Sequence, residues 1–288
     1  MYKFDPHGEP LDSAFRAIAI DQLDEALSDL AQPDTSGRSI VHEARRRTKK
    51  LRGLLRLVRP GFPGFDREND ALRDAAASLS HLRDREVRRE TLRALAKWRP
   101  VSLLERLLAG STEPAAHDDA APLAAFRERM VEVRARAGQW ALSRPGLETL
   151  EAGVRRTYRT ARRRMRKARD LHEPTRFHDW RKSNKNYGFG IDLLRKAAPE
   201  LLGGELDVID KLSTTLGQHH DLVVLQAAAA QEQLPLNGSE ELVELNALIG
   251  ERLAELERES FELGRQVYAE TPDARTRRVM AYWKSARS

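Results

Sequence analysis

Apolar residues recur at helical spacing along nearly the whole chain, and this pattern constrains the fold more than any other feature. One example consists of Leu147, Leu150, Val154, Tyr158, Ala161 and Met165. Residues three or four positions apart lie on one face of a helix, whereas a half-buried strand needs strict alternation. Alternating runs rich in β-branched residues do not occur in the sequence. We therefore predict an all-α protein.

Segments rich in glycine, proline and small polar residues interrupt the helical pattern. They lie at residues 32–37, 60–65, 109–122, 143–146, 172–174 and 236–240. The helices between them are expected at residues 12–31, 39–58, 67–98, 122–142, 147–171, 176–197, 205–233 and 239–269. Long helices joined by short turns favour antiparallel bundles.

The chain also contains an internal repeat. SIVHEARRRTKK aligns with TRFHDWRKSNKN, and SLSHLRDREV aligns with TLGQHHDLVV at nearly the same offset. The first pair matches His42 with His178, and the second matches Asp84 with Asp221. Two matches at nearly equal spacing imply two copies of one four-helix unit. The two aspartates are expected to orient arginines or to neutralise part of the basic cluster.

Positive charge is concentrated in two windows of the chain. Residues 38–59 hold nine Lys and Arg against one acidic residue, and residues 155–196 hold fifteen against four. The whole chain carries a formal net charge of only +6, so the remaining residues are acidic overall. Such segregation predicts a focused positive site whose partner is a polyanion.

The first basic window contains a helix with a histidine near its start, three residues after Ser39, a residue type that favours helix N-termini. At about 100° of rotation per residue, one stripe consists of His42, Arg45, Lys49 and Arg52. The opposite face is apolar and consists of Leu51, Leu54, Leu55 and Val58. We expect the apolar face to enter the core and the basic stripe to point away from it.

The second basic window repeats this arrangement after Thr175. Its stripe consists of His178, Arg181 and Lys185, and the buried side is expected to hold Trp180, Tyr187, Ile191 and Leu194. A helix N-terminus offers unpaired backbone N–H groups, and arginine adds a forked donor that matches phosphate oxygens. The two stripes therefore predict a phosphate-binding site. The alternative is a solvated basic face with a capping histidine.

The expected helix at residues 147–171 offers further arginines that could form a wall of the same site. They are Arg155, Arg159, Arg162 and Arg166, with Arg156 and Arg163 beside them. The alternative is an exposed basic face next to the apolar stripe of this helix. The corresponding helix of the first copy is acidic, so the second copy is expected to bind anions more strongly.

The sequence favours binding without chemistry. The chain has no cysteine, which excludes thiolate catalysis and Cys-based zinc sites. His219 and His220 are consecutive and do not face one point on a helix, and no Gly-rich phosphate loop or HExxH pair occurs. We expect no metal and no cofactor. No segment approaches the roughly 20 apolar residues of a membrane span, and no apolar signal segment occurs, so a cytoplasmic location is expected.

The order of these motifs is similar to that of the CHAD family, the conserved histidine α-helical domain. The resemblance rests on HEARRRTKKLR, HDWRKSNKNYG, GVRRTYRTARRRM, LSTTLGQHHDLVVL and RRVMAYW, which span almost the whole chain. It implies a single domain over residues 10–285 with two tandem four-helix bundles, about 10–143 and 146–285, related by a pseudo-twofold axis around a basic cavity. It also implies that inorganic polyphosphate is the ligand.

The resemblance extends directly to both stripes and more loosely to the arginines of residues 147–171. Neighbouring basic residues complete the predicted polyphosphate-binding set, namely Arg46, Lys50 and Lys182. Gly188 occupies the position that matches Arg52 of the first stripe. We expect a non-enzymatic polyphosphate-binding protein that associates with polyphosphate granules. The alternatives are a nucleic-acid-binding helical protein and a phosphotransfer protein that uses His42 or His178.

Overall fold

The computed structural model describes residues 2–30, 40–79, 84–110 and 120–288, without the side chains of residues 84–86. These residues form eleven α-helices and no strand, which confirms the all-α prediction. The helices are α1 (Leu11–Asp29), α2 (Ile40–Val58), α3 (Phe65–Ser78), α4 (Asp84–Trp98), α5 (Ser102–Gly110), α6 (Ala120–Ala137), α7 (Gly146–Leu171), α8 (Pro174–Leu194), α9 (Pro199–Ala230), α10 (Ser239–Val267) and α11 (Pro272–Ser285). Two 3₁₀ turns, η1 (Arg59–Gly61) and η3 (Arg195–Ala197), follow α2 and α8.

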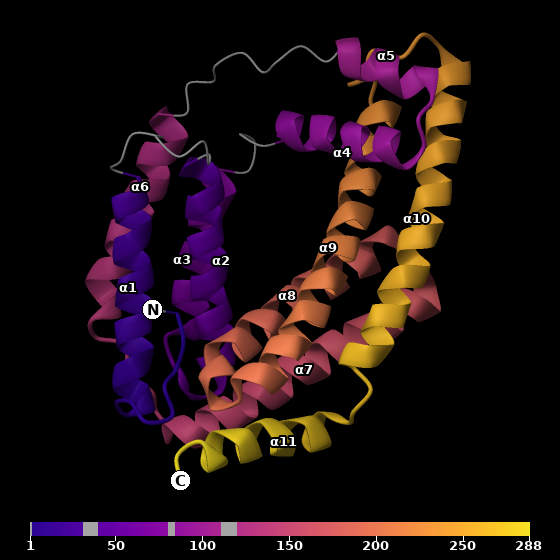
Figure 1. The fold of residues 1–288 in the computed structure, drawn as a ribbon. Helices are drawn as coiled ribbons and strands as arrows, with labels where there is room; N and C mark the ends of the chain where they lie inside the picture. The colour runs from indigo at the N-terminus through magenta and orange to yellow at the C-terminus, as the bar shows by residue number, and fades with distance from the viewer. Residues whose placement is uncertain (1, 31–39, 80–83, 111–119) are drawn as a thin grey trace.

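The helices form two arms that meet at one end of the molecule (Figure 1). One arm is a bundle in which α1, α2, α3 and α6 pack on one another. The other arm contains α9 and α10, with α4 and α5 packed near its far end. Helices α7 and α8 pack together and join the arms, and α11 crosses α7 below them. A pseudo-twofold relation between the two halves stays a prediction.

Several predicted helix limits were wrong. The segment predicted as one helix over residues 67–98 forms two helices, α3 and α4, that belong to different cores. Leu72 and Ala75 of α3 lie in the large core, whereas Leu92 and Leu95 of α4 lie in the small one. Because the apolar period continues through both helices, the sequence alone did not reveal the division. Helices α5 and α11 were not predicted either, since each spans only a few turns.

The large core extends through both arms and buries the faces that the periodicity assigned to it. Leu51, Leu54, Leu55 and Val58 of α2 are at most 1% exposed, as are Trp180, Tyr187, Ile191 and Leu194 of α8. The smaller core lies between α4, α5, α9 and α10. Both predicted apolar faces are therefore confirmed, and the basic stripes are left on the outer sides of the same helices.

Close backbone contact fixes the place where the two arms meet. A Cβ atom at Gly153 of α7 would overlap the carbonyl oxygen of Leu57 in α2. Only glycine lets the two helices approach to this extent. The contact brings the end of α2 against the first half of α7, where arginines of both helices meet.

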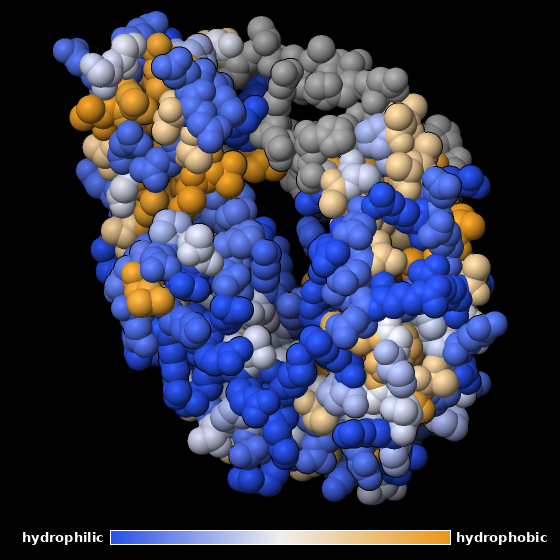
Figure 2. Space-filling view, turned by 180° about the vertical axis from the view of Figure 1, so that it is seen from behind, coloured by the Kyte–Doolittle hydropathy of each residue, from blue (hydrophilic) through white to orange (hydrophobic). Residues whose placement is uncertain are grey.

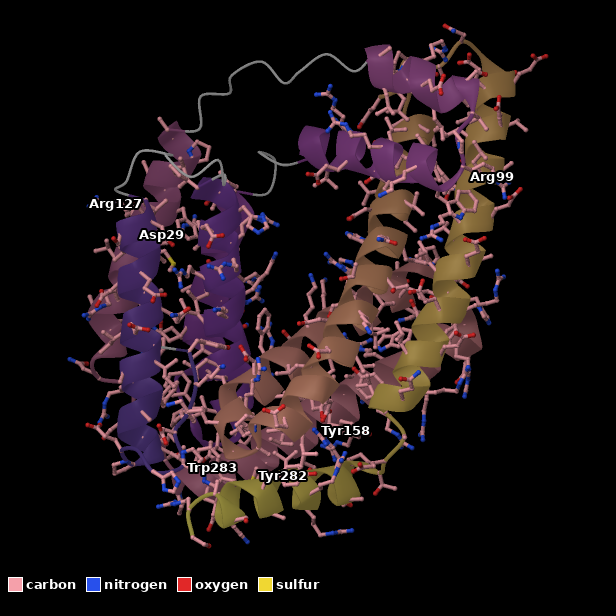
Figure 3. All side chains as sticks on the ribbon, viewed as in Figure 1. Asp29, Arg99, Arg127, Tyr158, Tyr282 and Trp283 are labelled. Carbon is pink, nitrogen blue, oxygen red and sulfur yellow. The ribbon has the colours of Figure 1, made fainter. Side chains whose placement is uncertain are left out.

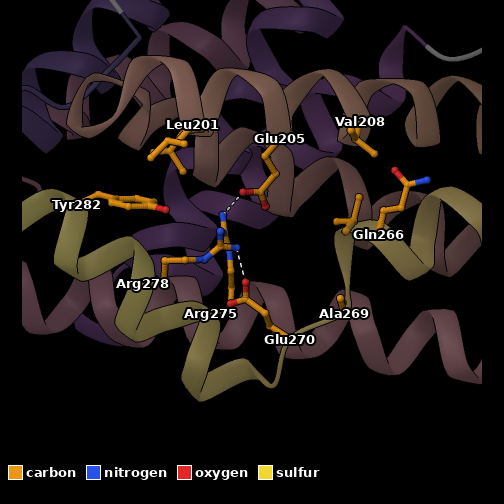
Figure 4. Close-up of a pocket in the computed structure, with 11 residues that line it drawn as sticks. Leu201, Glu205, Val208, Gln266, Ala269, Glu270, Arg275, Arg278 and Tyr282 are labelled. Carbon is orange, nitrogen blue, oxygen red and sulfur yellow. Dashed lines mark hydrogen bonds and ion pairs between the residues drawn. The ribbon is translucent and has the colours of Figure 1, made fainter.

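A buried ion pair anchors α11 to the rest of the fold (Figure 4). Arg275 is 1% exposed; its Nε donates to the Tyr187 hydroxyl at 2.7 Å, and its Nη2 pairs with Glu205. The Tyr187 hydroxyl in turn donates to Glu205 at 2.8 Å. Burial raises the pKa of Tyr187 well above its ordinary value. Arg275 and Glu205 line a cavity of about 230 Å³. A second ion pair, Arg278 with Glu270, lines the same cavity.

The helices of the described part of the chain are all too short or too polar to cross a membrane.

Candidate anion-binding site

An opening separates the two arms, and the side chains around it are mostly hydrophilic (Figure 2). Nitrogen-tipped side chains of α2 and α9 point toward this opening from opposite sides (Figure 3). The predicted stripe of α2 belongs to one arm, and the predicted stripe of α8 lies at the base of the other. The opening is therefore the place where both stripes could meet a single ligand.

Two arginines of the α2 stripe donate hydrogen bonds to α3. Arg45 donates from Nη1 to the carbonyl oxygen of Ala76 at 3.3 Å, and Arg52 donates from Nε to Asn69 Oδ1 at 3.2 Å. His42 and Lys49 are exposed. Burial, followed by the charge of Arg73, lowers the pKa of Arg52, although a guanidinium remains charged at neutral pH. The stripe thus presents cations that are held in place by a neighbouring helix.

Other basic residues of α2 lie on a different side of the helix. Arg46 pairs with Glu43 at 2.6 Å, and Arg47 pairs with Glu25 and Asp29 of the acidic α1. The Lys50 ammonium lies 5.1 Å from the ring centre of Tyr2. Burial and the nearby Arg46 lower the pKa of Lys50. The structure therefore does not bring Lys50 together with the stripe, and it engages Arg46 in a local ion pair.

The second histidine lies farther inside its helix than predicted. α8 begins at Pro174 with Glu173 as the preceding residue, so Thr175 is not the cap. Proline suits the first helical position because it lacks the N–H group that would be unpaired there. His178 consequently lies beyond the first turn, and its contacts come from side chains rather than from the helix N-terminus. The capping role predicted for Ser39 lies outside the described residues.

His178 of α8 belongs to a compact basic cluster with residues of α9. Its ring lies 4.4 Å from the ring of His220, centre to centre. Burial, followed by the charges of Lys182 and Arg181, lowers the pKa of His178. Burial is the main cause that lowers the pKa of His220 to about 4, and electrostatic repulsion from Arg181 and His178 adds to this effect. Both histidines are therefore neutral at pH 7, and the positive charge of the cluster resides on Arg181 and Lys182.

The cluster contains buried donors that have no partner among the described residues. His178 Nδ1 and Arg181 Nε are buried without a hydrogen-bond partner there. Burial lowers the pKa of Arg181, and the charge of Asp221 opposes this effect. The role of Asp221 in orienting arginines or neutralising part of the cluster stays a prediction. The same role for Asp84 concerns a side chain outside the described part. Buried polar groups of this kind normally contact a water molecule or a ligand.

The two consecutive histidines of α9 point in different directions. His219 is 2% exposed, stacks on Phe177 at 4.4 Å and lies 3.2 Å from Glu257. His220 faces His178 instead. His220 was not among the residues predicted for the site, although its position next to Asp221 in the repeated segment was a usable signal.

Two cavities lie along α7 where the two arms meet, and we call them the junction cavities; the first also borders the end of α2 and one side of α8. The first has a volume of about 140 Å³ and is lined by Arg56, Arg59, Arg156, Thr157, Thr160, Ser183 and Asn186. The second has a volume of about 220 Å³ and is lined by Arg156, Arg159, Thr160 and Arg163. Burial, Arg52 and Arg59 lower the pKa of Arg56 to about 10, so it remains charged at pH 7. Among the described residues, no acidic side chain lines either cavity.

Sequence reasoning missed Arg56 and Arg59. Both continue the stripe of α2 at helical spacing beyond Arg52, so the periodicity contained the information. Their exposure is limited because Arg56 donates to the Arg52 carbonyl at 3.1 Å and Arg59 lies over the Phe65 ring at 4.2 Å. At the matching end of the second stripe, Gly188 replaces arginine because a Cβ there would lie only 2.8 Å from Ile209 of α9.

The predicted arginines of α7 divide between two faces of the helix. Arg156, Arg159 and Arg163 line the junction cavities. Arg155 instead pairs with Glu151 at 3.2 Å and with Asp273 of α11 at 3.1 Å. Arg162 donates to the Tyr268 carbonyl at 3.1 Å. Arg166 is exposed and lines neither cavity.

The arrangement is suited to holding an anion. It combines guanidinium groups with the hydroxyl and amide side chains of Thr160, Ser183 and Asn186, and arginine is the preferred partner of phosphate oxygens. Within the described residues no group of three or more His, Asp or Glu side chains could hold a metal ion. The fold and the site thus define an all-α protein with a basic surface where its two arms meet.

The family comparison agrees with this class. The family model of the CHAD domain matches residues 18–230, well over half of the chain, so the chain belongs to the CHAD family. This family is associated with polyphosphate binding. A comparison with curated proteins finds no match.

Proposed function

We propose that the protein binds inorganic polyphosphate without changing it chemically. The observation that carries the proposal is the pair of arginine-lined junction cavities, which no acidic side chain lines within the described part of the chain. A polyanion could follow the stripe of α2, enter the junction at Arg56 and continue to the cluster of His178 and Arg181. Association with polyphosphate granules would follow from the same binding.

The spacing of the cations supports a chain-like ligand. Neighbouring residues of a helical stripe, three or four positions apart, lie about 5–6 Å from one another. Arg45, Lys49, Arg52 and Arg56 are related in this way, so successive phosphates of one chain can each meet a cation. A single phosphate would engage only one or two of these groups. We therefore infer a preference for long chains.

The environment of the aromatic side chains argues against single-stranded nucleic acid as the ligand. Proteins that bind single strands stack bases on exposed aromatic rings. Trp180 and Phe177, which are sequence neighbours of Arg181 and His178, and Tyr158 of α7 are all at most 1% exposed. Backbone contacts alone would give duplex DNA no advantage over a phosphate chain of higher charge density.

A competition experiment tests the proposal. Fluorescently labelled long-chain polyphosphate is bound to the full chain, and unlabelled polyphosphate, duplex DNA and single-stranded RNA are added at equal phosphate concentrations in one buffer. We expect polyphosphate to displace the label at a far lower concentration than either nucleic acid. Equal displacement by DNA or RNA would refute polyphosphate as the preferred ligand. A stable phosphohistidine after incubation with a labelled phosphodonor would refute binding without chemistry.

A further inference from the structure

A larger cavity lies beside the basic cluster of α8 and α9 and has no part in the polyphosphate path described above. Its volume is about 500 Å³, and side chains of α4, α9 and α10 enclose it. The apolar part of its lining consists of Val87, Ala94, Leu95, Trp98, Leu222 and Leu256. Both the volume and the largely apolar lining are typical of small-molecule sites, which range from about 300 to 1,000 Å³.

Asp221 connects this cavity to the basic cluster. Its side chain lines the cavity, and its charge acts on Arg181 of α8. The preceding residue, His220, contacts His178. The cavity and the cluster are therefore neighbours on α9. A ligand in the cavity can extend an anionic group onto Arg181 and His178, whose buried nitrogens have no partner among the described residues.

The polar groups of the lining indicate what the enclosed part of such a ligand contains. Glu90 and Asp221 line the cavity together with the cations Lys97 and Arg252, so the charges of the lining balance and a further phosphate meets no net attraction there. Carboxylates accept hydrogen bonds from hydroxyl and amino groups, as an acidic residue does from ribose in dinucleotide sites. Gln218 adds an amide that both donates and accepts. The lining thus suits a sugar and a base rather than a further phosphate.

Two planar side chains that line the cavity favour a ligand with an aromatic ring. Trp98 and Arg252 both line it, and the Arg252 guanidinium lies 5.6 Å from the Trp98 ring centre. Guanidinium planes and aromatic rings are the surfaces on which nucleic-acid bases stack.

We propose that this cavity binds the nucleoside part of a nucleoside polyphosphate such as ATP, with the phosphate chain on His178, Arg181 and His220. The proposal rests on the proposed polyphosphate function, because the same cluster holds the phosphates. It adds a second ligand class that competes with polyphosphate at one end of the basic surface.

The test compares ATP with tripolyphosphate, which offers a similar phosphate chain without a nucleoside. Isothermal titration of the full chain should give an affinity for ATP that is about tenfold higher or more, the gain expected from stacking one base. Ala94→Trp fills the cavity from an exposed position of α4. This variant should lose the advantage of ATP and keep its affinity for tripolyphosphate. Ala227→Trp, at an exposed position of α9 outside the cavity, is the matched control and should behave like the unmodified protein.

Each outcome bears on one of the two proposals. Equal affinities for ATP and tripolyphosphate in the unmodified protein would overturn the nucleoside site and leave polyphosphate binding intact. Equal losses of both ligands in Ala94→Trp would also overturn it, since the change would then act through the cluster. Binding of neither ligand would refute the polyphosphate proposal itself. Circular dichroism shows whether Ala94→Trp folds. If it does not fold, the affinities of the unmodified protein and of Gln218→Ala for ATP and for tripolyphosphate still decide whether the cavity binds a nucleoside.

Discussion

The rings of His178 and His220 lie 4.4 Å apart on the adjacent helices α8 and α9, centre to centre. Burial is the main reason why both have lowered pKa values, and Arg181 lowers both further. In the ligand-free protein, neutral imidazoles thus surround a charged guanidinium. A bound phosphate would reverse this balance, because a nearby negative charge stabilises the protonated imidazole.

Polyphosphate affinity is therefore expected to increase as the pH falls from 7.5 to 5.5. A bound phosphate raises the histidine pKa values, so binding takes up protons wherever the pH lies between the free and bound values. Each proton taken up increases the affinity by at most about tenfold per pH unit. Titration calorimetry in buffers of different ionisation enthalpy counts these protons. His220→Gln should remove most of the increase, whereas His7→Gln, at an exposed N-terminal position, should not; identical pH profiles in both variants would contradict the prediction.

The ligand-free protein should show the opposite dependence in its stability. The pKa of His220 is about 4 in the folded protein and ordinarily 6.5, so the unfolded chain binds more protons between these values. The free energy of unfolding therefore decreases as the pH falls from about 6.5 toward 4. After allowance for the partial solvent exposure of the ring, the loss is on the order of 1 kcal/mol. Urea unfolding at pH 7 and pH 5 should show a smaller loss in His220→Gln, and an equal loss would assign the effect to other groups.

Neighbouring arginines of α7 provide a matched test of the junction cavities. Arg156 lines both cavities, whereas Arg155 is paired with Glu151 and Asp273 on another face. Arg156→Gln should weaken polyphosphate binding about tenfold, the effect of losing a hydrogen bond to a charged group. Arg155→Gln should change the affinity by less than about twofold. Fluorescence titration at fixed ionic strength measures both, and equal losses would show that only the total charge of α7 matters.

The difference between Arg155 and Arg156 also shows where sequence reasoning reached its limit. The apolar faces of α2 and α8 were predictable because helical periodicity is a local property of the chain. The partner of each arginine is not local. Arg155 meets Asp273 of α11, a helix that was not predicted, and the sequence offered no means of knowing where α11 lies. In contrast, Arg56 and Arg59 continue a visible stripe, and extending the predicted site along it would have found them.

The contact that joins the arms gives a prediction about stability. Gly153→Ala places a methyl group against the Leu57 carbonyl, and the overlap should lower the free energy of unfolding by about 3 kcal/mol or more. Gly250→Ala is the matched control, because nothing lies within 4 Å of the added atom in α10. It should raise the stability by about 0.5–1 kcal/mol, since alanine is the better helix former. Chemical denaturation compares the two, and similar effects would mean that α2 and α7 separate easily.

The last prediction concerns whether the two stripes act on one ligand. The stripe of α2 belongs to one arm, and the cluster of α8 lies on the helix pair that joins this arm to α9. The first arginine-lined cavity lies where α2, α7 and α8 meet. If one chain spans this distance, its second contact benefits from a high effective concentration once the first has formed. A tripolyphosphate is too short to gain this advantage, because it occupies one part of the surface at a time.

Removing charge from one stripe should therefore weaken the binding of long chains far more than that of tripolyphosphate. The two variants are Arg45→Ala with Lys49→Ala, and Arg181→Ala with Lys185→Ala. The second should have the larger effect, because Arg181 offers a buried donor and α7 contributes its arginines close to that half. Circular dichroism must first show intact helices, and isothermal titration with long and short chains then measures each affinity. Equal relative losses for both chain lengths would mean that the stripes are independent basic patches, because only a bridged ligand makes the affinity at one stripe depend on the other.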